Sequence, residues 1–501
     1  MISLRKSLLG TYSRYLISKS CTALLFITLC GCVQTEPYRV TAMSNEQATC
    51  DPVMNADKPD DNGSVSSTCA TYMLEHAARY DLLFSEFDDQ GWANNPKKID
   101  NPILHTMQAG PRDPSTAFGN LKKFLDDQAK NHDRLMIITF VHGWKHNAST
   151  DDTNVKLFRQ VLENTATLEE KTNSGRHVVG VYLGWRGDSL NVPDGIKSVL
   201  TFYDRKDTAD EVSKGAIHEV IAYLNAYERR ENRLSDGQCD VASASEGCKV
   251  VSVFIGHSFG GLILYEAIAP AVLSSVIDGE VYSKSAQPPP VERFGDMVLL
   301  INPAIEAARF QPLFRSVATY QPKKYKSPLM VLVTTDADVA TGTFFPLGRF
   351  FSTFFEAKDD QEQRDAVLET IGHMKPYVTH YLHHFDTTPL GNVGDAPGIW
   401  PRRFGDGNVL YVCDKEYASY PVWNIETDKS VMKGHSDLDN PNLRNFVVAL
   451  IDDAIVQSER MKNPPPHRIQ TGAAQGDDVP INCLSSDNYD RLKAIDPAKS
   501  N

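Results

Sequence analysis

The sequence lacks a basic stretch that could bind nucleic acid, and it lacks internal repeats and low-complexity runs. Its 51 Lys and Arg residues are outnumbered by 64 Asp and Glu residues, which gives a net charge of −13. An acidic surface repels phosphate backbones, so we expect no nucleic-acid partner. Apolar residues make up 41% of the chain and charged residues 23%, a composition typical of a globular protein with a large core.

Cysteine is scarce, and none of the nine cysteines has the short paired spacing of a metal site. We therefore expect no structural zinc and no metal at the active site. Three cysteines lie within residues 1–32, and an even number remains beyond them, which suits disulfides in an oxidising compartment. Short loops favour the pairs Cys50–Cys69 and Cys239–Cys248, which leaves Cys413–Cys483; free buried thiols are the alternative.

The N-terminus has the pattern of a targeting segment. A basic stretch without acids leads into the apolar run Cys21–Cys30, which has the length of a secretory signal and is short for a membrane-spanning helix. The run ends in Leu29-Cys30-Gly31-Cys32, which resembles a bacterial lipobox. The resemblance implies cleavage before Cys32, lipid attachment to it and, because neither of the next two residues is Asp, transport to the outer membrane. A plain signal peptide or an uncleaved anchor is the alternative.

We expect four regions along the chain. A lipoprotein signal peptide over 1–31 is followed by a polar tether or N-terminal extension over 32–75. Residues 76–460 form one large domain, and residues 461–501 form an irregular C-terminal tail.

Short apolar runs alternate with longer helical patterns in the large domain. This alternation predicts an α/β fold with a mainly parallel central sheet and helices on both faces. The expected strands are Tyr80–Phe87, Leu135–Val141, His177–Leu183, Val250–Ile255, Met297–Ile301 and Pro328–Thr334. The expected helices are Ser115–Asn131, Asn154–Glu169, Thr208–Glu231, Gly260–Ile277, Asp359–Ile371 and Asn442–Ser458.

The segment Gly256-His-Ser258-Phe-Gly260 joins an apolar strand to a helical pattern. The Gly-x-Ser-x-Gly pattern alone is weak, because glycine and serine are common. Between a buried strand and a helix, it predicts a sharp turn that lifts the serine above the sheet edge, where it can act as a nucleophile. A purely structural turn is the alternative.

A second element, His142-Gly143-Trp144, follows the earlier strand Leu135–Val141. Together the two elements resemble the α/β-hydrolase superfamily of lipases and esterases. The resemblance implies that the backbone N–H groups of Trp144 and Phe259 form an oxyanion hole, and that His142 is a scaffold residue rather than a base.

The same resemblance places the catalytic acid after a late strand and the catalytic histidine before the last helix. Asp336 and Asp338 are both candidates for the acid, and we favour Asp338 because it lies a few residues into the loop. His435 is the expected base. The histidine cluster at 379–384 is interpreted as structural or exposed rather than metal-binding, because no ligand motif accompanies it.

A triad of Ser258, His435 and Asp338 predicts two-step hydrolysis of a carboxylic ester, including lipid-like esters, without a cofactor. Trp185 and Arg186 follow a predicted strand and are candidates for substrate binding, Trp185 at the entrance and Arg186 on an anionic group; packing or a surface ion pair is the alternative. A thioesterase or a peptidase uses the same triad. The alternative from another functional class is an inactive hydrolase fold that serves as an envelope binding or structural lipoprotein.

Overall fold

The computed structural model describes residues 37–41, 70–94, 117–187, 196–233, 248–282, 292–319, 328–346, 360–386 and 401–462. The expected signal peptide, Cys32 and the C-terminal tail lie outside these residues. Cys248 and Cys413 are disulfide-bonded, but the other four cysteines considered for pairing are not among the described residues. The cysteine pairings and the region boundaries therefore stay predictions.

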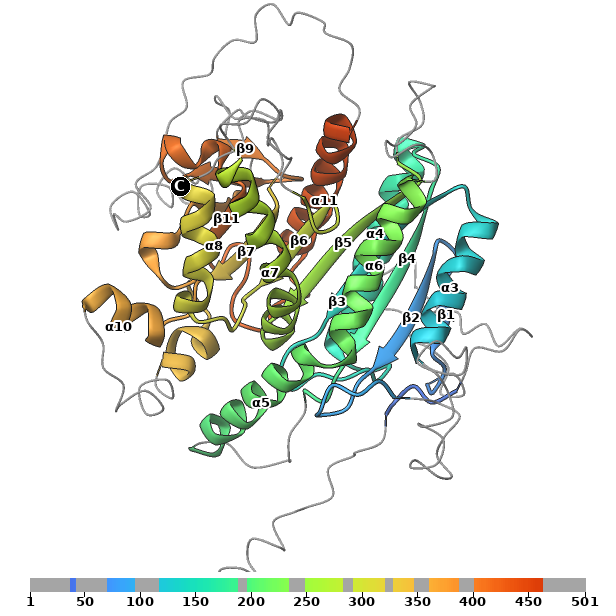
Figure 1. The fold of residues 1–501 in the computed structure, drawn as a ribbon, viewed down its shortest axis with the longest axis horizontal. Coiled ribbons are helices and arrows are strands. Elements are labelled where there is room, and N and C mark those ends of the chain that lie inside the picture. Colours follow the sequence, from blue (N-terminus) through green and yellow to red (C-terminus); the bar gives the residue numbers. More distant parts are fainter. Residues whose placement is uncertain are drawn as a thin grey trace, which may run out of the picture.

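The centre of the protein is one sheet of 11 strands, in the order β1-β2-β4-β3-β5-β6-β7-β11-β8-β10-β9 (Figure 1). The strands from β2 to β8 in this order pair in parallel, and antiparallel pairs occur towards the two edges. The strands are β1 (Leu74–His76), β2 (Tyr80–Glu86), β3 (Arg134–Val141), β4 (Arg176–Gly184), β5 (Val250–His257), β6 (Met297–Ile301), β7 (Met330–Thr335), β8 (His380–His384), β9 (Arg402–Arg403), β10 (Asn408–Val412) and β11 (Val422–Thr427). The predicted α/β fold with a mainly parallel sheet is confirmed.

Helices cover both faces of the sheet. One apolar core lies between the sheet and α3, α5, α6, α7 and α8, and a second lies between the opposite face and α4 and α11. The helices are α3 (Ala117–Asn131), α4 (Thr153–Thr172), α5 (Ile196–Lys214), α6 (Ala216–Arg233), α7 (Phe259–Val281), α8 (Ala307–Thr319), α10 (Gln361–Leu368) and α11 (Pro441–Lys462), with short turns η2 (Ala340–Phe344), η3 (Lys375–Tyr377) and η4 (Lys415–Ser419). Figure 1 shows α6 and α7 side by side across the same face.

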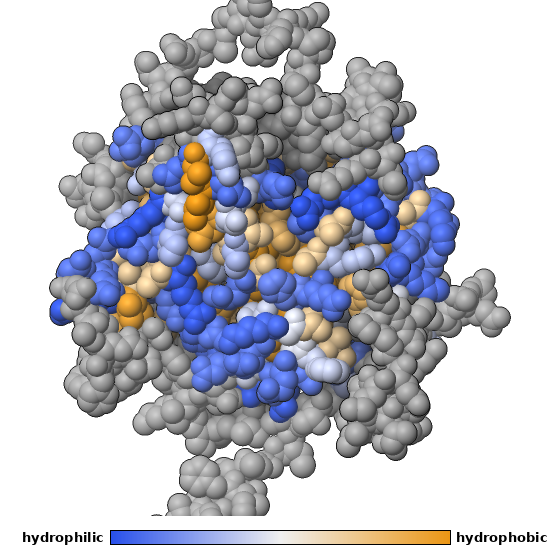
Figure 2. Space-filling model, viewed as in Figure 1, coloured by the Kyte–Doolittle hydropathy of each residue, from blue (hydrophilic) through white to orange (hydrophobic). Residues whose placement is uncertain are grey.

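This two-sided cover explains why the central strands are buried along their whole length. Every residue of β2, β5, β6, β7 and β11 is buried. Among the described residues, α7 is long and apolar enough to cross a membrane by composition, but 56% of its most apolar window is buried inside the protein. Hydrophilic residues cover much of the described surface in Figure 2, with apolar residues visible between them.

The predicted helix Thr208–Glu231 is wrong in one respect, because two helices, α5 and α6, occupy this part of the chain. They meet at Gly215, where the backbone N–H of Ala216 bonds to the carbonyl of Gly91. A Cβ at position 215 would lie 2.5 Å from that carbonyl oxygen. The close approach of two backbones therefore interrupts the helix, which the sequence pattern alone does not reveal.

Part of the predicted tether packs onto the domain. The side chain of Arg39 is buried and lies 3.0 Å from the carboxylate of Glu75, which also binds Arg159 at 2.7 Å. The backbone N–H groups of Tyr38 and Arg39 both donate to Glu86 at the end of β2. Breaking such a buried ion pair is costly, so these contacts fix residues 38–39 against the sheet.

Candidate active site

Ser258 occupies a sharp turn between β5 and α7. Its φ of 55° and ψ of −120° are unfavourable for a residue with a Cβ, and strain of this kind is concentrated at functional sites. Small residues flank the turn because the backbone is crowded there: a Cβ on Gly260 would lie 2.1 Å from the carbonyl oxygen of Val141. The turn has the strand-to-helix geometry expected from the sequence, at the carboxyl end of a central parallel strand.

Three side chains from distant parts of the chain form a continuous hydrogen-bonded row. The Nε2 atom of His435 lies 2.8 Å from Ser258 Oγ, and its Nδ1 atom lies 2.8 Å from Asp338 Oδ2. Asp338 follows β7, and His435 lies between β11 and α11. Asp338 is 2% exposed, whereas Asp336 is an exposed residue. The fold thus brings Ser258, His435 and Asp338 together and leaves Asp336 at the surface.

The surroundings of Asp338 keep it ionised. Burial raises its pKa, but the charge and hydrogen bond of His435 and two hydrogen bonds from Thr341 outweigh burial and hold the pKa at about 2. Thr341 donates its backbone N–H over 3.0 Å and also its hydroxyl. His373 in turn lies 3.0 Å from the Thr341 hydroxyl oxygen. An ionised carboxylate accepts the Nδ1–H of His435, so the Nε2 atom facing Ser258 is free to accept a proton.

The main chain of His435 is fixed as well as its side chain. Its carbonyl oxygen accepts hydrogen bonds from His257 Nε2 at 3.0 Å and from Asn302 Nδ2 at 2.9 Å. The Oδ1 atom of Asn302 accepts the backbone N–H of Thr335 at the end of β7. Burial lowers the pKa of His257 well below its usual value, so this imidazole is neutral. Asn302 has a positive φ of 44°, a second strained residue at the site.

The segment after β3 lies directly against the serine. A Cβ on Gly143 would lie 2.7 Å from Ser258 Cβ, so only glycine permits this approach. Trp144 follows Gly143 in the chain, and Phe259, the first residue of α7, follows the serine. The two backbone positions expected to stabilise an oxyanion therefore belong to the two segments that meet at Ser258.

His142 and Trp185 support this segment from behind. His142 is fully buried; burial lowers its pKa to about 4, so it is neutral. Its Nε2 atom accepts the backbone N–H of Trp185, so its Nδ1–H faces the carbonyl of Gly143 at 2.9 Å. The indole N–H of Trp185 donates to the carbonyl of His142 at 2.8 Å. Trp185 is 3% exposed and packs against the scaffold histidine, and its role in substrate binding stays a prediction.

Arg186 is partly exposed and already has an acidic partner. Its Nη1 atom lies 3.1 Å from Asp89 Oδ2, and the two side chains are 26% and 29% exposed. Arg205 also contacts Asp89, at 3.4 Å. Binding of an anionic substrate group by Arg186 stays a prediction, and such a group would compete with Asp89.

Asn302, Thr341, His373 and His257 are residues of the site that sequence reasoning did not assign. Asn302, Thr341 and His257 contact a triad residue or its backbone, His373 contacts Thr341, and none of the four lies in a motif of its own. The one available signal was His257, which lies within the serine motif. The side chains of the described residues that gather with metal-ligand spacing are elsewhere, in the group Asp81, His132 and His177.

No protein-family model matches the chain, and no curated protein matches it. Among solved structures, the phospholipase PlaB from Legionella pneumophila, in complex with thio-NAD, is similar over 51% of this chain and 47% of its own. The sequence identity is 14% and the TM-score is 0.21. The match thus spans about half of the phospholipase, and the interpretation of this site depends on its own geometry.

Proposed function

We propose that the protein is a serine hydrolase that cleaves carboxylic esters through an acyl-enzyme. The observation that carries this proposal is the row Asp338–His435–Ser258, with both hydrogen bonds at 2.8 Å. A serine hydroxyl is a weak nucleophile, and it needs an adjacent base that a third group orients. The row supplies all three parts in the order that acyl transfer requires.

In the first step, Ser258 Oγ attacks the ester carbonyl while His435 Nε2 takes the hydroxyl proton. The ionised Asp338 stabilises the imidazolium that forms and keeps the Nδ1–H directed at itself. His435 then returns the proton to the leaving alcohol. In the second step, water attacks the acyl group on Ser258 with His435 again acting as the base, and the acid is released.

The negative charge on the tetrahedral intermediate needs donors that are already in place. We propose the backbone N–H groups of Trp144 and Phe259, and the tight contact between Gly143 and Ser258 supports this assignment. Ser258 also lies at the start of α7, a helix of 23 residues whose N-terminus favours negative charge. One such donor is typically worth about 3 kcal/mol of transition-state stabilisation.

We also propose a location and a substrate class. The lipobox-like sequence ending at Cys32 supports a lipoprotein anchored in the outer membrane. An enzyme held at a membrane meets lipid-like esters at high local concentration, so we propose esters with long acyl chains as substrates. The competing function is that of a binding or structural protein that has kept the hydrolase fold without catalytic activity. The experiment below separates it from the proposed ester hydrolysis.

The test is hydrolysis of p-nitrophenyl esters from acetate to palmitate by the wild type, Ser258→Ala and His435→Ala. Ser274→Ala and His218→Ala are matched controls, because both are exposed residues on the helices α7 and α6. We expect activity that both site variants lose and both controls keep, with a rate that rises with acyl length. Activity that survives Ser258→Ala would refute the serine mechanism. A wild type that neither hydrolyses these esters nor reacts with a fluorophosphonate would support an inactive binding protein.

A further inference from the structure

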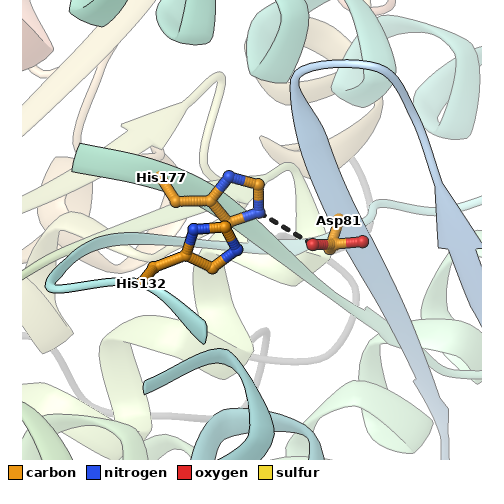
Figure 3. A group of neighbouring side chains, drawn as sticks. All are labelled: Asp81, His132 and His177. Atoms are coloured by element: carbon orange, nitrogen blue, oxygen red, sulfur yellow. Dashed lines mark hydrogen bonds and ion pairs between the residues drawn. The ribbon is translucent and has the colours of Figure 1, made fainter. Parts of the chain in front are cut away.

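A second group of polar side chains lies far from Ser258. Figure 3 shows Asp81, His132 and His177 facing one another from three separate segments. Asp81 is in β2, His177 is in β4, and His132 lies between α3 and β3. One potential ligand atom from each residue lies within 4.8 Å of the others.

The strand register explains how residues far apart in the chain meet. β2 and β3 both pair in parallel with β4, so the first residues of all three strands come to the same edge of the sheet. Asp81 and His177 are each the second residue of their strands, and His132 closely precedes β3. Ser258 follows the last residue of β5, another strand of the same direction, so it lies at the opposite edge.

Hydrogen bonding within the group joins Asp81 and His177. His177 Nε2 lies 2.7 Å from Asp81 Oδ2, and the rings of His132 and His177 stack with centroids 3.8 Å apart and planes at 9°. Among the described residues, no side-chain hydrogen bond is made by the His132 ring. A neutral imidazole at this position therefore has a nitrogen available for a ligand that the other two residues share.

His76 orients the carboxylate from the other side. Its Nδ1 atom bonds to Oδ1 of Asp81, so Oδ2 stays directed at His177. Hydrogen bonds of this kind, from a residue outside the ligand set, commonly fix the orientation of metal ligands. The site is also open to solvent, because the side chains of His177 and Asp81 are 19% and 10% exposed.

We propose that Asp81, His132 and His177 bind a zinc ion. Two imidazoles and one carboxylate suit Zn²⁺, and solvent would supply the fourth ligand. Bonds of about 2.1 Å in a tetrahedral site separate the ligand atoms by roughly 3.4 Å, so His177 Nε2 and Asp81 Oδ2, 2.7 Å apart, separate slightly as the ion enters. The His132 ring turns out of its stack on His177 so that both imidazole lone pairs meet at the ion. His177 takes the tautomer with its proton on Nδ1, and the ion ties the α3–β3 connection to β2 and β4. This proposal is independent of the proposed ester hydrolysis.

The experiment is calorimetric titration of Zn²⁺ into purified protein without a polyhistidine tag, after removal of metal with a chelator. We expect one ion per chain and a rise in melting temperature with zinc concentration. His132→Ala, which removes a ligand without breaking a hydrogen bond, should abolish this binding, and Asp81→Asn should do the same. His76→Gln should weaken it roughly 10- to 100-fold.

His218→Ala, on the exposed face of α6, is the control and should bind zinc like the wild type. Ester hydrolysis by His132→Ala should equal that of the wild type, so failure of the zinc site is distinguishable from failure of the proposed function. No binding by the wild type would overturn the proposal. Equal binding by the wild type and His132→Ala would overturn it as well, because the ion would then occupy another place.

Discussion

Replacing Asp338 by Asn tests the proposed catalytic row by removing the charge of its buried acid. The pKa of Asp338 is about 2 against a usual 3.8, although burial alone would raise it. This difference corresponds to about 2 kcal/mol of preference for the ionised carboxylate. The carboxylate also stabilises the imidazolium that His435 becomes during the reaction, and a loss of about 2 kcal/mol of this stabilisation lowers the rate on the order of 10- to 100-fold.

The side-chain amide of the Asp338→Asn variant lowers kcat in a second way. In the Asp338→Asn variant, the side-chain amide can donate a hydrogen bond to His435 Nδ1, which moves the ring proton to Nε2 and leaves no acceptor for the Ser258 hydroxyl. A wrong tautomer of this kind costs on the order of 10⁴ in kcat in a serine protease. We therefore expect Asp338→Asn to lower kcat by a factor between about 10 and about 10⁴, with a small change in KM.

The assay is steady-state hydrolysis of the best p-nitrophenyl ester at about pH 8, with circular dichroism to verify folding. Asp336→Asn is the matched control, two residues away and exposed, and it should keep kcat within a factor of about two. A larger loss in Asp336→Asn than in Asp338→Asn would refute the assignment. A folded Asp338→Asn enzyme with more than a tenth of wild-type kcat would refute the electrostatic reasoning.

Individual contacts lead to four further predictions. Asn302→Leu removes a donor to the His435 carbonyl, so kcat should fall roughly 10- to 100-fold at unchanged KM, measured by ester hydrolysis. Gly215→Ala places a Cβ 2.5 Å from the Gly91 carbonyl oxygen, and urea unfolding should show a loss of about 1–3 kcal/mol. The depressed pKa of Asp338 stabilises the fold above about pH 3.8; acid titration should show about 2 kcal/mol lost as the pH falls towards 2, and less in a folded Asp338→Asn variant. Cys32→Ser should release the protein from membranes, and unchanged lipid labelling would contradict the anchor.

Elements that are buried on both faces could be predicted from the sequence. The strands β3, β5, β6 and β7 are nearly continuous apolar runs, and the predicted strands coincide with β2 to β7 to within two residues. The far side of the sheet was not predicted, because β8 reads His-Tyr-Leu-His-His and β11 alternates polar with apolar residues. In these strands the polar side chains are buried by specific hydrogen bonds, such as those of Asn424 to the carbonyls of Ile371 and Tyr377. Such bonds have no periodic signal.

Features that depend only on residues adjacent in the chain could be predicted from the sequence. The turn at Ser258 is set by glycines two positions away and by the strand and helix on either side, so the local pattern was sufficient. Contacts across the chain needed the folded protein: Asp338 rather than Asp336 beside His435, Trp185 behind His142, and Asp81 with His132 and His177. Strand order and register set these distances, and both are fixed by the packing of the whole sheet rather than by any short segment.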